Sequence, residues 1–127
     1  MTTYTESRRA LEFLAWEVNP QYSREEVTLT AAQGDLKAGT VMAKVTGTGN
    51  YVPYDDDANA GTAGVGIAAG VLCYDVPNNA ATQKIVIIAR SAIVKSDLLV
   101  WEASNDAGEK TAAIAELVAL GILVRAS

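Results

Sequence analysis

The order of its segments constrains this chain most: short segments typical of β-strands follow one another, and one helical segment comes late. Apolar and polar side chains alternate over residues 27–30 and 40–46, and residues 85–90 form the strongest apolar run. Pro53 has no backbone N–H to donate, so residues 51–54 are predicted to be an edge strand or a strand end. Because no strand–helix unit repeats, the sequence predicts an α+β fold that is mostly β.

One segment near the C-terminus is predicted to be a helix. Asp106 begins a weak capping box, and an alanine-rich segment with apolar side chains on one face follows it. Gly121 is placed to end the helix, with Ile122 in contact with Leu117 as in a Schellman motif. Residues 122–125 are predicted to form a last strand. The expected architecture is a small, compact body of short strands with one C-terminal helix, preceded by an extended N-terminal arm.

Composition excludes several classes of site. The 127 residues fit one domain, and the chain has no histidine and a single cysteine. Catalytic triads, histidine-containing zinc sites and internal disulfides are therefore excluded, so we expect no enzyme, no metal site and no cofactor. The net charge of −5 disfavours nucleic acid as a partner, and no apolar run approaches the roughly 20 residues of a membrane-spanning helix. We expect a protein of a reducing, soluble compartment, without a secretory signal.

An acidic segment has part of the spacing of a calcium loop. Asp55, Asp57 and Asn59 match ligand positions 1, 3 and 5 of an EF-hand. Ala60 stands in place of the glycine of the sharp turn, and Gly66 in place of the bidentate glutamate. We therefore predict a solvated turn and not a calcium site.

Two further motifs are predicted to be structural. Residues 64–70 contain the pattern GxGxxxG, which is one residue longer than the dinucleotide-binding fingerprint and lacks its strand–helix context. We predict a small-residue strand in which backbones approach closely or the chain bends. Cys73 lies between Leu72 and Tyr74 in an apolar strand, so a buried, unreactive thiol is predicted.

The first 26 residues differ from the rest of the chain and allow two interpretations. They hold many charged residues and most of the bulky aromatic side chains. The apolar segment 11–18 fits neither the helical nor the strand period, and Asn19-Pro20 interrupts any helix. The segment is either a piece of the core or an arm that docks on another molecule. We predict the docking arm, so a chain without residues 1–22 should stay folded, and Trp16 should contact another chain.

A series of segments also occurs in a specific order and spacing. The segments are Ser23–Leu29, Leu36–Val41, Tyr51–Asp55, Leu99–Trp101, the capped alanine-rich helix and Leu120–Arg125. In this order the chain resembles the head decoration proteins of tailed bacteriophages, the family of the lambda decoration protein D. The similarity covers about residues 11–125, and none of the segments is a catalytic signature.

The resemblance implies a structural role in the virion. Members of this family form homotrimers on the outside of the expanded head, at three-fold and quasi-three-fold positions, and stabilise the head against the pressure of packaged DNA. It implies that the chain, made in the host cytoplasm, binds the major capsid protein and further copies of itself, with no nucleic acid or membrane partner. It divides the chain into a capsid-docking arm, residues 1–26, and a β-rich, trimer-forming body, residues 27–127. The side chains it suggests for shell contact are Leu11, Phe13, Leu14, Trp16, Ser23, Arg24, Glu25 and Val27.

Two points stay open in the sequence. The arm is rich in apolar and acidic residues, so it can dock as an added strand or as a short helix. The alternative function is a β-rich virion module of another kind, such as a tail or fibre component or a glycan-binding surface protein. A glycan-binding surface needs exposed aromatic side chains, for which the body offers Tyr51, Tyr54, Tyr74 and Trp101, the last of them predicted to be core.

Overall fold

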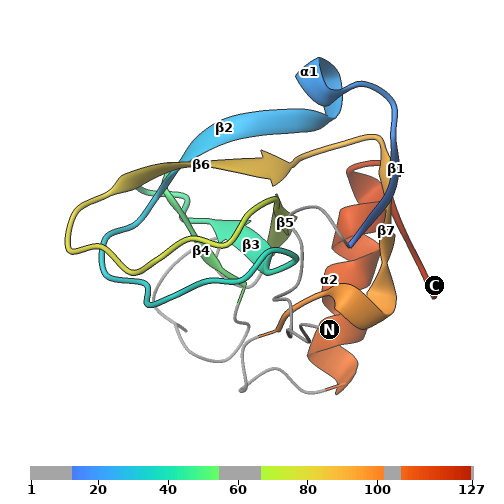
Figure 1. The fold of residues 1–127 in the computed structure, drawn as a ribbon. Helices are drawn as coiled ribbons and strands as arrows, with labels where there is room; N and C mark the ends of the chain where they lie inside the picture. The colour runs from blue at the N-terminus through green and yellow to red at the C-terminus, as the bar shows by residue number, and fades with distance from the viewer. Residues whose placement is uncertain (1–12, 55–66, 102–106, 127) are drawn as a thin grey trace, which may run out of the picture.

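The computed structural model describes residues 13–54, 67–101 and 107–126 of the chain. Its elements, in order, are β1 (Leu14–Glu17), α1 (Pro20–Ser23), β2 (Arg24–Leu29), β3 (Val41–Lys44), β4 (Tyr51–Pro53), β5 (Ala68–Leu72), β6 (Gln83–Ile88), β7 (Ala92–Lys95), the 3₁₀ turn η1 (Ser96–Leu98), α2 (Ala107–Ala119) and β8 (Ile122–Arg125) (Figure 1). These elements are mostly strands with one main C-terminal helix, which confirms the predicted α+β class. The predicted boundary between residues 26 and 27 falls inside β2.

Five of the strands close into a barrel in the order β2-β4-β3-β5-β6, with β6 returning to β2. The longest ladder joins β2 and β6, which are antiparallel and in register from Arg24 opposite Ile88 to Leu29 opposite Gln83. The other three strands form a second sheet in the order β1-β7-β8, in which β1 is antiparallel and β8 parallel to the central β7. β1 and β8, the first and last of the described strands, are thus the two edges of one sheet.

The core lies where the two sheets meet the main helix. α2 contacts β5 of the barrel and β8 of the second sheet, so it joins the two. One buried cluster links the helix to the second sheet and includes Phe13, Val94, Ala113, Leu117 and Ile122. Another cluster belongs to the barrel strands and includes Leu29, Met42, Leu72, Ile85 and Ile87. The second sheet therefore buries one face, whereas β3 and β5 of the barrel bury side chains on both faces. What the chain offers to partners lies on the remaining surfaces.

The end of α2 has the positive-φ glycine and the 5→2 hydrogen bond of the predicted Schellman motif. Gly121 has a φ of +85°, which glycine adopts without a steric cost, and its N–H donates to the Val118 carbonyl at 2.9 Å. Ile122 begins β8 and lies in the same buried cluster as Leu117. The helix therefore stops and the chain turns directly into a strand, as predicted. Asp106, the predicted cap at the other end, lies outside the described residues.

Pro53 and Gly70 occupy the kinds of position that the sequence predicted. Pro53 is the last residue of β4, which lies between β2 and β3 in the barrel, so it marks a strand end and not an edge. Gly70 lies in β5, where a Cβ atom would meet the carbonyl oxygen of Ile88 at 2.7 Å and Cδ1 of Ile87 at 2.8 Å. The close backbone approach predicted for this segment is confirmed at Gly70.

Cys73 is buried, as predicted, and its thiol should be unreactive in the folded protein. Burial raises the pKa of this thiol to about 12, although the charge of Arg24 acts in the opposite direction. At pH of about 8 the reactive thiolate is therefore scarce. We expect iodoacetamide to label the native protein at least about a hundredfold more slowly than the same protein unfolded in urea. Equal labelling rates would contradict the burial of Cys73.

Candidate docking surface

The segment that follows Phe13 is fixed to the second sheet by β1. β1 pairs with β7, and the Lys95 N–H donates to the Phe13 carbonyl at 2.7 Å. At the other end of β1, the Val18 N–H donates to the Ser91 carbonyl at 3.1 Å. The Phe13 side chain is fully buried in the core. Of the two interpretations that the sequence left open, the structure gives Phe13 the core position, so its ring is not accessible to a partner in this conformation.

A β-bulge explains why this segment fits no regular period. Leu14 lies opposite Val94, whereas Trp16 lies opposite Ile93, so two residues of β1 advance the pairing by only one residue of β7. Val94 faces the core and Ile93 the other side of the sheet. Leu14 therefore packs on the core, while 53% of Trp16 is exposed. This exposure leaves Trp16 open to another molecule, and the contact itself stays a prediction.

The Asn19-Pro20 pair begins a helix, whereas its sequence predicted that it would interrupt one. Asn19 has extended backbone angles, and its side-chain oxygen accepts a hydrogen bond from the Gln21 N–H at 2.8 Å, which caps α1. A proline is tolerated at the first helical position because that residue's N–H has no partner within the helix. The residues before the pair form a strand, so there is no helix for the pair to interrupt.

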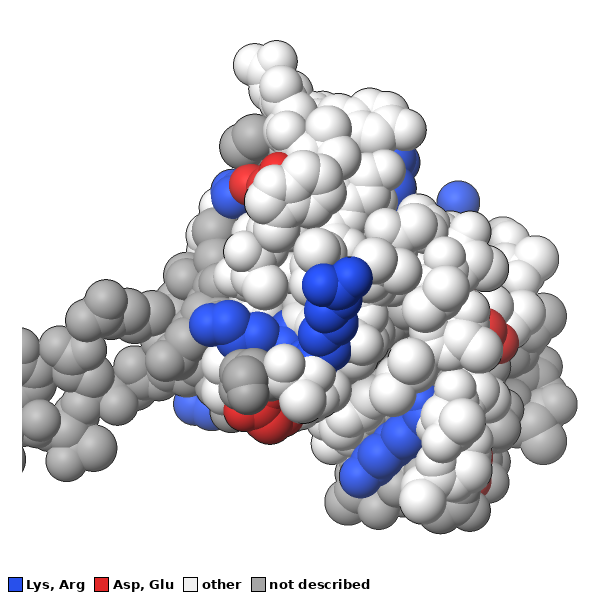
Figure 2. All heavy atoms as spheres, turned by 90° about the vertical axis from the view of Figure 1, so that its right-hand side faces the viewer, with Lys and Arg blue, Asp and Glu red and all other residues white. Residues whose placement is uncertain are grey.

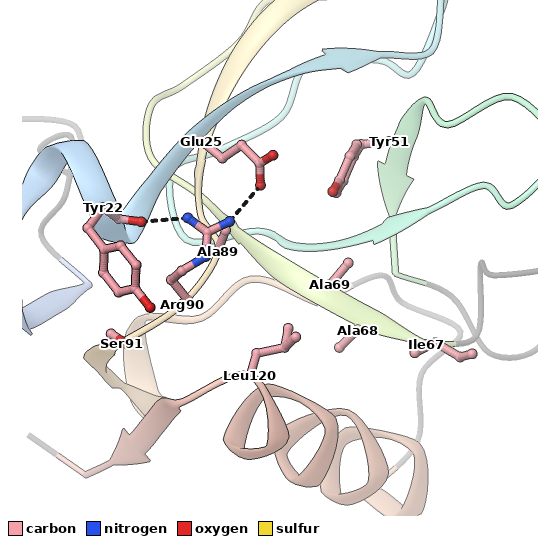
Figure 3. Close-up of a pocket in the computed structure, with 10 residues that line it drawn as sticks. All are labelled: Tyr22, Glu25, Tyr51, Ile67, Ala68, Ala69, Ala89, Arg90, Ser91 and Leu120. Carbon is pink, nitrogen blue, oxygen red and sulfur yellow. Dashed lines mark hydrogen bonds and ion pairs between the residues drawn. The ribbon is translucent and has the colours of Figure 1, made fainter.

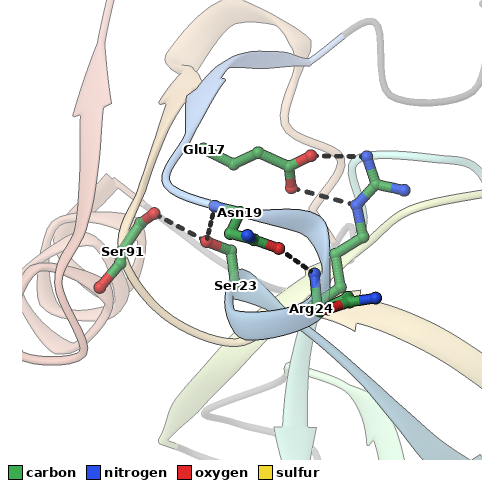
Figure 4. Close-up of polar contacts among 6 residues, drawn as sticks. Glu17, Asn19, Ser23, Arg24 and Ser91 are labelled. Carbon is green, nitrogen blue, oxygen red and sulfur yellow. Dashed lines mark hydrogen bonds and ion pairs between the residues drawn. The ribbon is translucent and has the colours of Figure 1, made fainter.

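Ser23 and Arg24 hold β1 and the second sheet against the start of the barrel (Figure 4). Ser23 is fully buried, and its hydroxyl donates to the Ser91 carbonyl at 3.0 Å. Arg24 forms a two-point ion pair with Glu17 of β1, with Nε 3.0 Å from Oε2 and Nη2 2.7 Å from Oε1. The hydrogen bond to this carboxylate raises the pKa of the Arg24 guanidinium. Both residues thus have internal partners that the sequence did not reveal.

Two further residues suggested for shell contact, Glu25 and Val27, lie in the first strand of the barrel, β2. Glu25 is exposed and pairs with Arg90, with Nη2 3.0 Å from Oε2. Arg90 also donates to the Tyr22 carbonyl at 2.5 Å, and its guanidinium carbon lies 5.5 Å from the centre of the Tyr22 ring. Val27 is half-buried and packs on the barrel cluster. Leu11 lies outside the described residues.

An open hollow of about 530 Å³ lies beside the Arg90–Glu25 pair (Figure 3). Three exposed apolar side chains, Tyr22, Ile67 and Leu120, line it together with small alanine residues. Its shape and lining suit an apolar side chain of another molecule placed beside a fixed charge pair. The sequence could not reveal this hollow, because its lining comes from segments far apart in the chain.

In the described ranges, no group of three or more His, Cys, Asp or Glu side chains could hold a metal ion. No helix in the same parts of the chain has the length and apolar character needed to cross a membrane. The acidic segment with Asp55, Asp57 and Asn59 lies outside the described residues, as do Gly64 and Gly66. The solvated turn expected there stays a prediction.

A family model matches almost the whole chain. Its description is bacteriophage lambda head decoration protein D, and it matches residues 3–122 of the 127. No curated protein matches the chain. The matched range includes all strands of the barrel, the second sheet up to the start of β8, and the whole of α2. The resemblance found in the sequence is thereby confirmed, and the chain belongs to the family of the bacteriophage lambda head decoration protein D, a family of structural proteins that bind the phage capsid.

Proposed function

We propose that this chain binds as a homotrimer to the outside of the expanded phage head, at three-fold and quasi-three-fold positions, and stabilises the head against the pressure of packaged DNA. The family match over residues 3–122 carries the proposal. The partners are the major capsid protein and further copies of the chain, with no nucleic acid, no membrane and no catalysis. The protein is made in the host cytoplasm and resides on the outer surface of the virion.

The distribution of exposed apolar side chains supports contacts with other chains. Single exposed apolar residues are normal, but here several of them gather in two places. Tyr22 and Ile67, each more than half exposed, lie at the hollow, whereas Trp16 and Leu123 lie on the second sheet. A trimer that also binds a lattice needs such surfaces on each chain, for contacts with its neighbours and with the shell.

We propose that the capsid-docking arm ends before Phe13 and does not extend to residue 26. Phe13 and Ser23 are fully buried, and Arg24 is paired with Glu17, so these residues are built into the fold. The docking elements are then the residues before Phe13 together with the exposed Trp16. Three arms on one trimer bind with avidity, because the second and third arms bind at a high effective concentration.

Cosedimentation with decoration-free phage heads tests the proposed function. The full-length protein should pellet with expanded heads and not with unexpanded heads. It should also raise the temperature at which expanded heads break, because a ligand that binds only the intact shell stabilises that shell. Light scattering on the free protein should give the mass of a trimer. A monomer at micromolar concentration, or equal binding to both kinds of head, would contradict the proposal.

The alternative glycan-binding function finds little support in the aromatic side chains. Tyr51 and Tyr54 are buried, and Trp101 is half-buried against the Tyr54 ring in an edge-on contact with centroids 6.2 Å apart. Of the four candidates, only Tyr74 is exposed. Glycan readers stack sugars on exposed rings, so the described body favours attachment to protein over attachment to sugar.

A further inference from the structure

The second sheet has one buried face and one exposed face. Alternate residues of its strands point to opposite sides. The buried side chains on the inner side are Ala92, Val94 and Ile122. On the other side, Trp16 lies opposite Ile93, and Ile93 lies opposite Leu123, so three large apolar side chains form a row across all three strands. We call this side, with its residues Trp16, Ile93, Lys95, Leu123 and Arg125, the outer sheet face.

The outer sheet face also brings two cations together. Lys95 of β7 lies directly opposite Arg125 of β8. Like charges opposite each other in a sheet repel, and neither side chain has an ion pair within 4.0 Å among the described residues. Figure 2 views the molecule from this side and shows basic side chains on a largely uncharged surface, with few acidic atoms. On a chain with a net charge of −5, this local excess of positive charge needs an explanation.

We propose that the outer sheet face is the surface with which the folded body rests on the phage head, against an acidic patch of the shell protein. Carboxylates of the shell would relieve the repulsion between Lys95 and Arg125, and an apolar recess would accept the Trp16 ring. This inference rests on the proposed function and adds to it the contacting face and the chemistry of the partner surface.

The position of the outer sheet face favours the shell over a second copy of the chain as the occupant. The repulsion between like cations excludes only a symmetric contact between two such faces, because the subunits of a trimer contact each other through two different patches. The face includes β1, which directly follows the residues proposed as the docking arm. The arm and the face can therefore reach the same partner.

The binding test compares variants of the outer sheet face with matched controls elsewhere on the chain. Trp16→Ala removes the aromatic side chain of the face, and the double variant Lys95→Glu/Arg125→Glu reverses both charges. Tyr74→Ala and Lys44→Glu are the controls, because both residues are exposed and lie on the barrel side of the chain. Affinity for decoration-free expanded heads is measured by cosedimentation at ionic strengths of about 0.05 M and about 0.5 M.

Trp16→Ala should weaken binding about tenfold or more at both ionic strengths, because buried aromatic anchors dominate interfaces. The charge reversal should weaken binding at least about tenfold at low ionic strength and less at high ionic strength, where charges are screened. Lys95→Arg keeps the charge and should bind like the unmodified protein, as should both controls. Circular dichroism melting and light scattering establish that each variant is folded and keeps the oligomeric state of the parent.

The outcomes separate the inference from the proposed function. If the parent protein binds expanded heads and the outer-face variants bind equally well, the inference fails and the proposed function stands. If the charge reversal dissociates the free oligomer, the face is a contact between copies, and the inference also fails. If the parent protein does not bind heads at all, the proposed function fails and takes the inference with it.

Discussion

Deletion of residues 1–18 should unfold the protein, whereas deletion of residues 1–12 should leave its body folded. The longer deletion removes the buried Phe13 ring, and the loss of such a ring costs about 3–5 kcal/mol. It also removes β1, an edge of the second sheet, and the Glu17 carboxylate that pairs with Arg24. Because the total stability of a domain is about 5–15 kcal/mol, these losses together remove most of it. The shorter deletion removes none of these contacts.

Circular dichroism melting of the two truncations provides the measurement. The chain without residues 1–12 should melt cooperatively near the temperature of the full chain and bind heads more weakly. The chain without residues 1–18 should show no cooperative transition. Phe13→Ala is the single-site version of this test, and Val18→Ala, at a residue that is 54% exposed in the same segment, is its control.

A docking arm that reached residue 22 would give the opposite result, because a chain without that arm would stay folded. A cooperative transition near the parent temperature after removal of residues 1–18 would show that Phe13 and β1 are dispensable for the body. The arm would then extend at least through Trp16, and the burial of Phe13 would be incidental to stability.

Local signals in the sequence were enough to predict the end of the main helix. Gly121 has to adopt a positive φ, and its N–H bonds to a carbonyl only three residues away, so neighbouring residues decide the structure there. The strand at residues 85–90 was equally accessible, since an apolar run of this length gives the strand directly and β6 covers most of it. Both features depend on contacts within a few residues.

The N-terminal segment shows what such local signals cannot predict. Its strand contains a bulge, and a bulge is defined by the partner strand and not by the sequence of the bulged strand. From its residue type, Ser23 is expected to lie on the surface. In the fold it is fully buried, and its hydroxyl donates to the Ser91 carbonyl. Its burial depends on a partner 68 residues away in the chain.

The candidate docking residues also fall into two groups: one that the sequence predicted, and others that only the fold brings together. Trp16 was predicted to contact another chain because it is an aromatic residue in an apolar terminal segment. Ile93 and Leu123 join it only through the register of β7 with β1 and β8, and a shift of one residue would turn them to the other face. The proximity of Lys95 and Arg125 has the same origin, so the outer sheet face is a property of the fold and not of any segment.

Gly70→Ala should destabilise the barrel strongly for a change of one methyl group. The new Cβ would lie 2.7 Å from the carbonyl oxygen of Ile88 and 2.8 Å from Cδ1 of Ile87. The Ile87 side chain can rotate, but the Ile88 oxygen belongs to the backbone of β6 and can move only with its strand. Overpacking of this kind costs about 1–3 kcal/mol, and more where the neighbour is rigid.

The position of Gly70 raises the free-energy cost of Gly70→Ala, because only a short ladder joins β5 and β6. Two residue pairs, Val71 with Ile88 and Leu72 with Ile87, join these strands and close the barrel on that side. Moving β6 away from the added Cβ strains both pairs and loosens the packing of the buried Ile87 and Leu72.

Gly47→Ala is the matched control, since a Cβ there would meet nothing within 4 Å. Denaturation in guanidinium should show Gly70→Ala less stable by at least about 2 kcal/mol and Gly47→Ala within about 0.5 kcal/mol of the parent. Equal stability of the two variants would mean that β5 and β6 can separate without cost, so that the barrel does not depend on the close approach at Gly70.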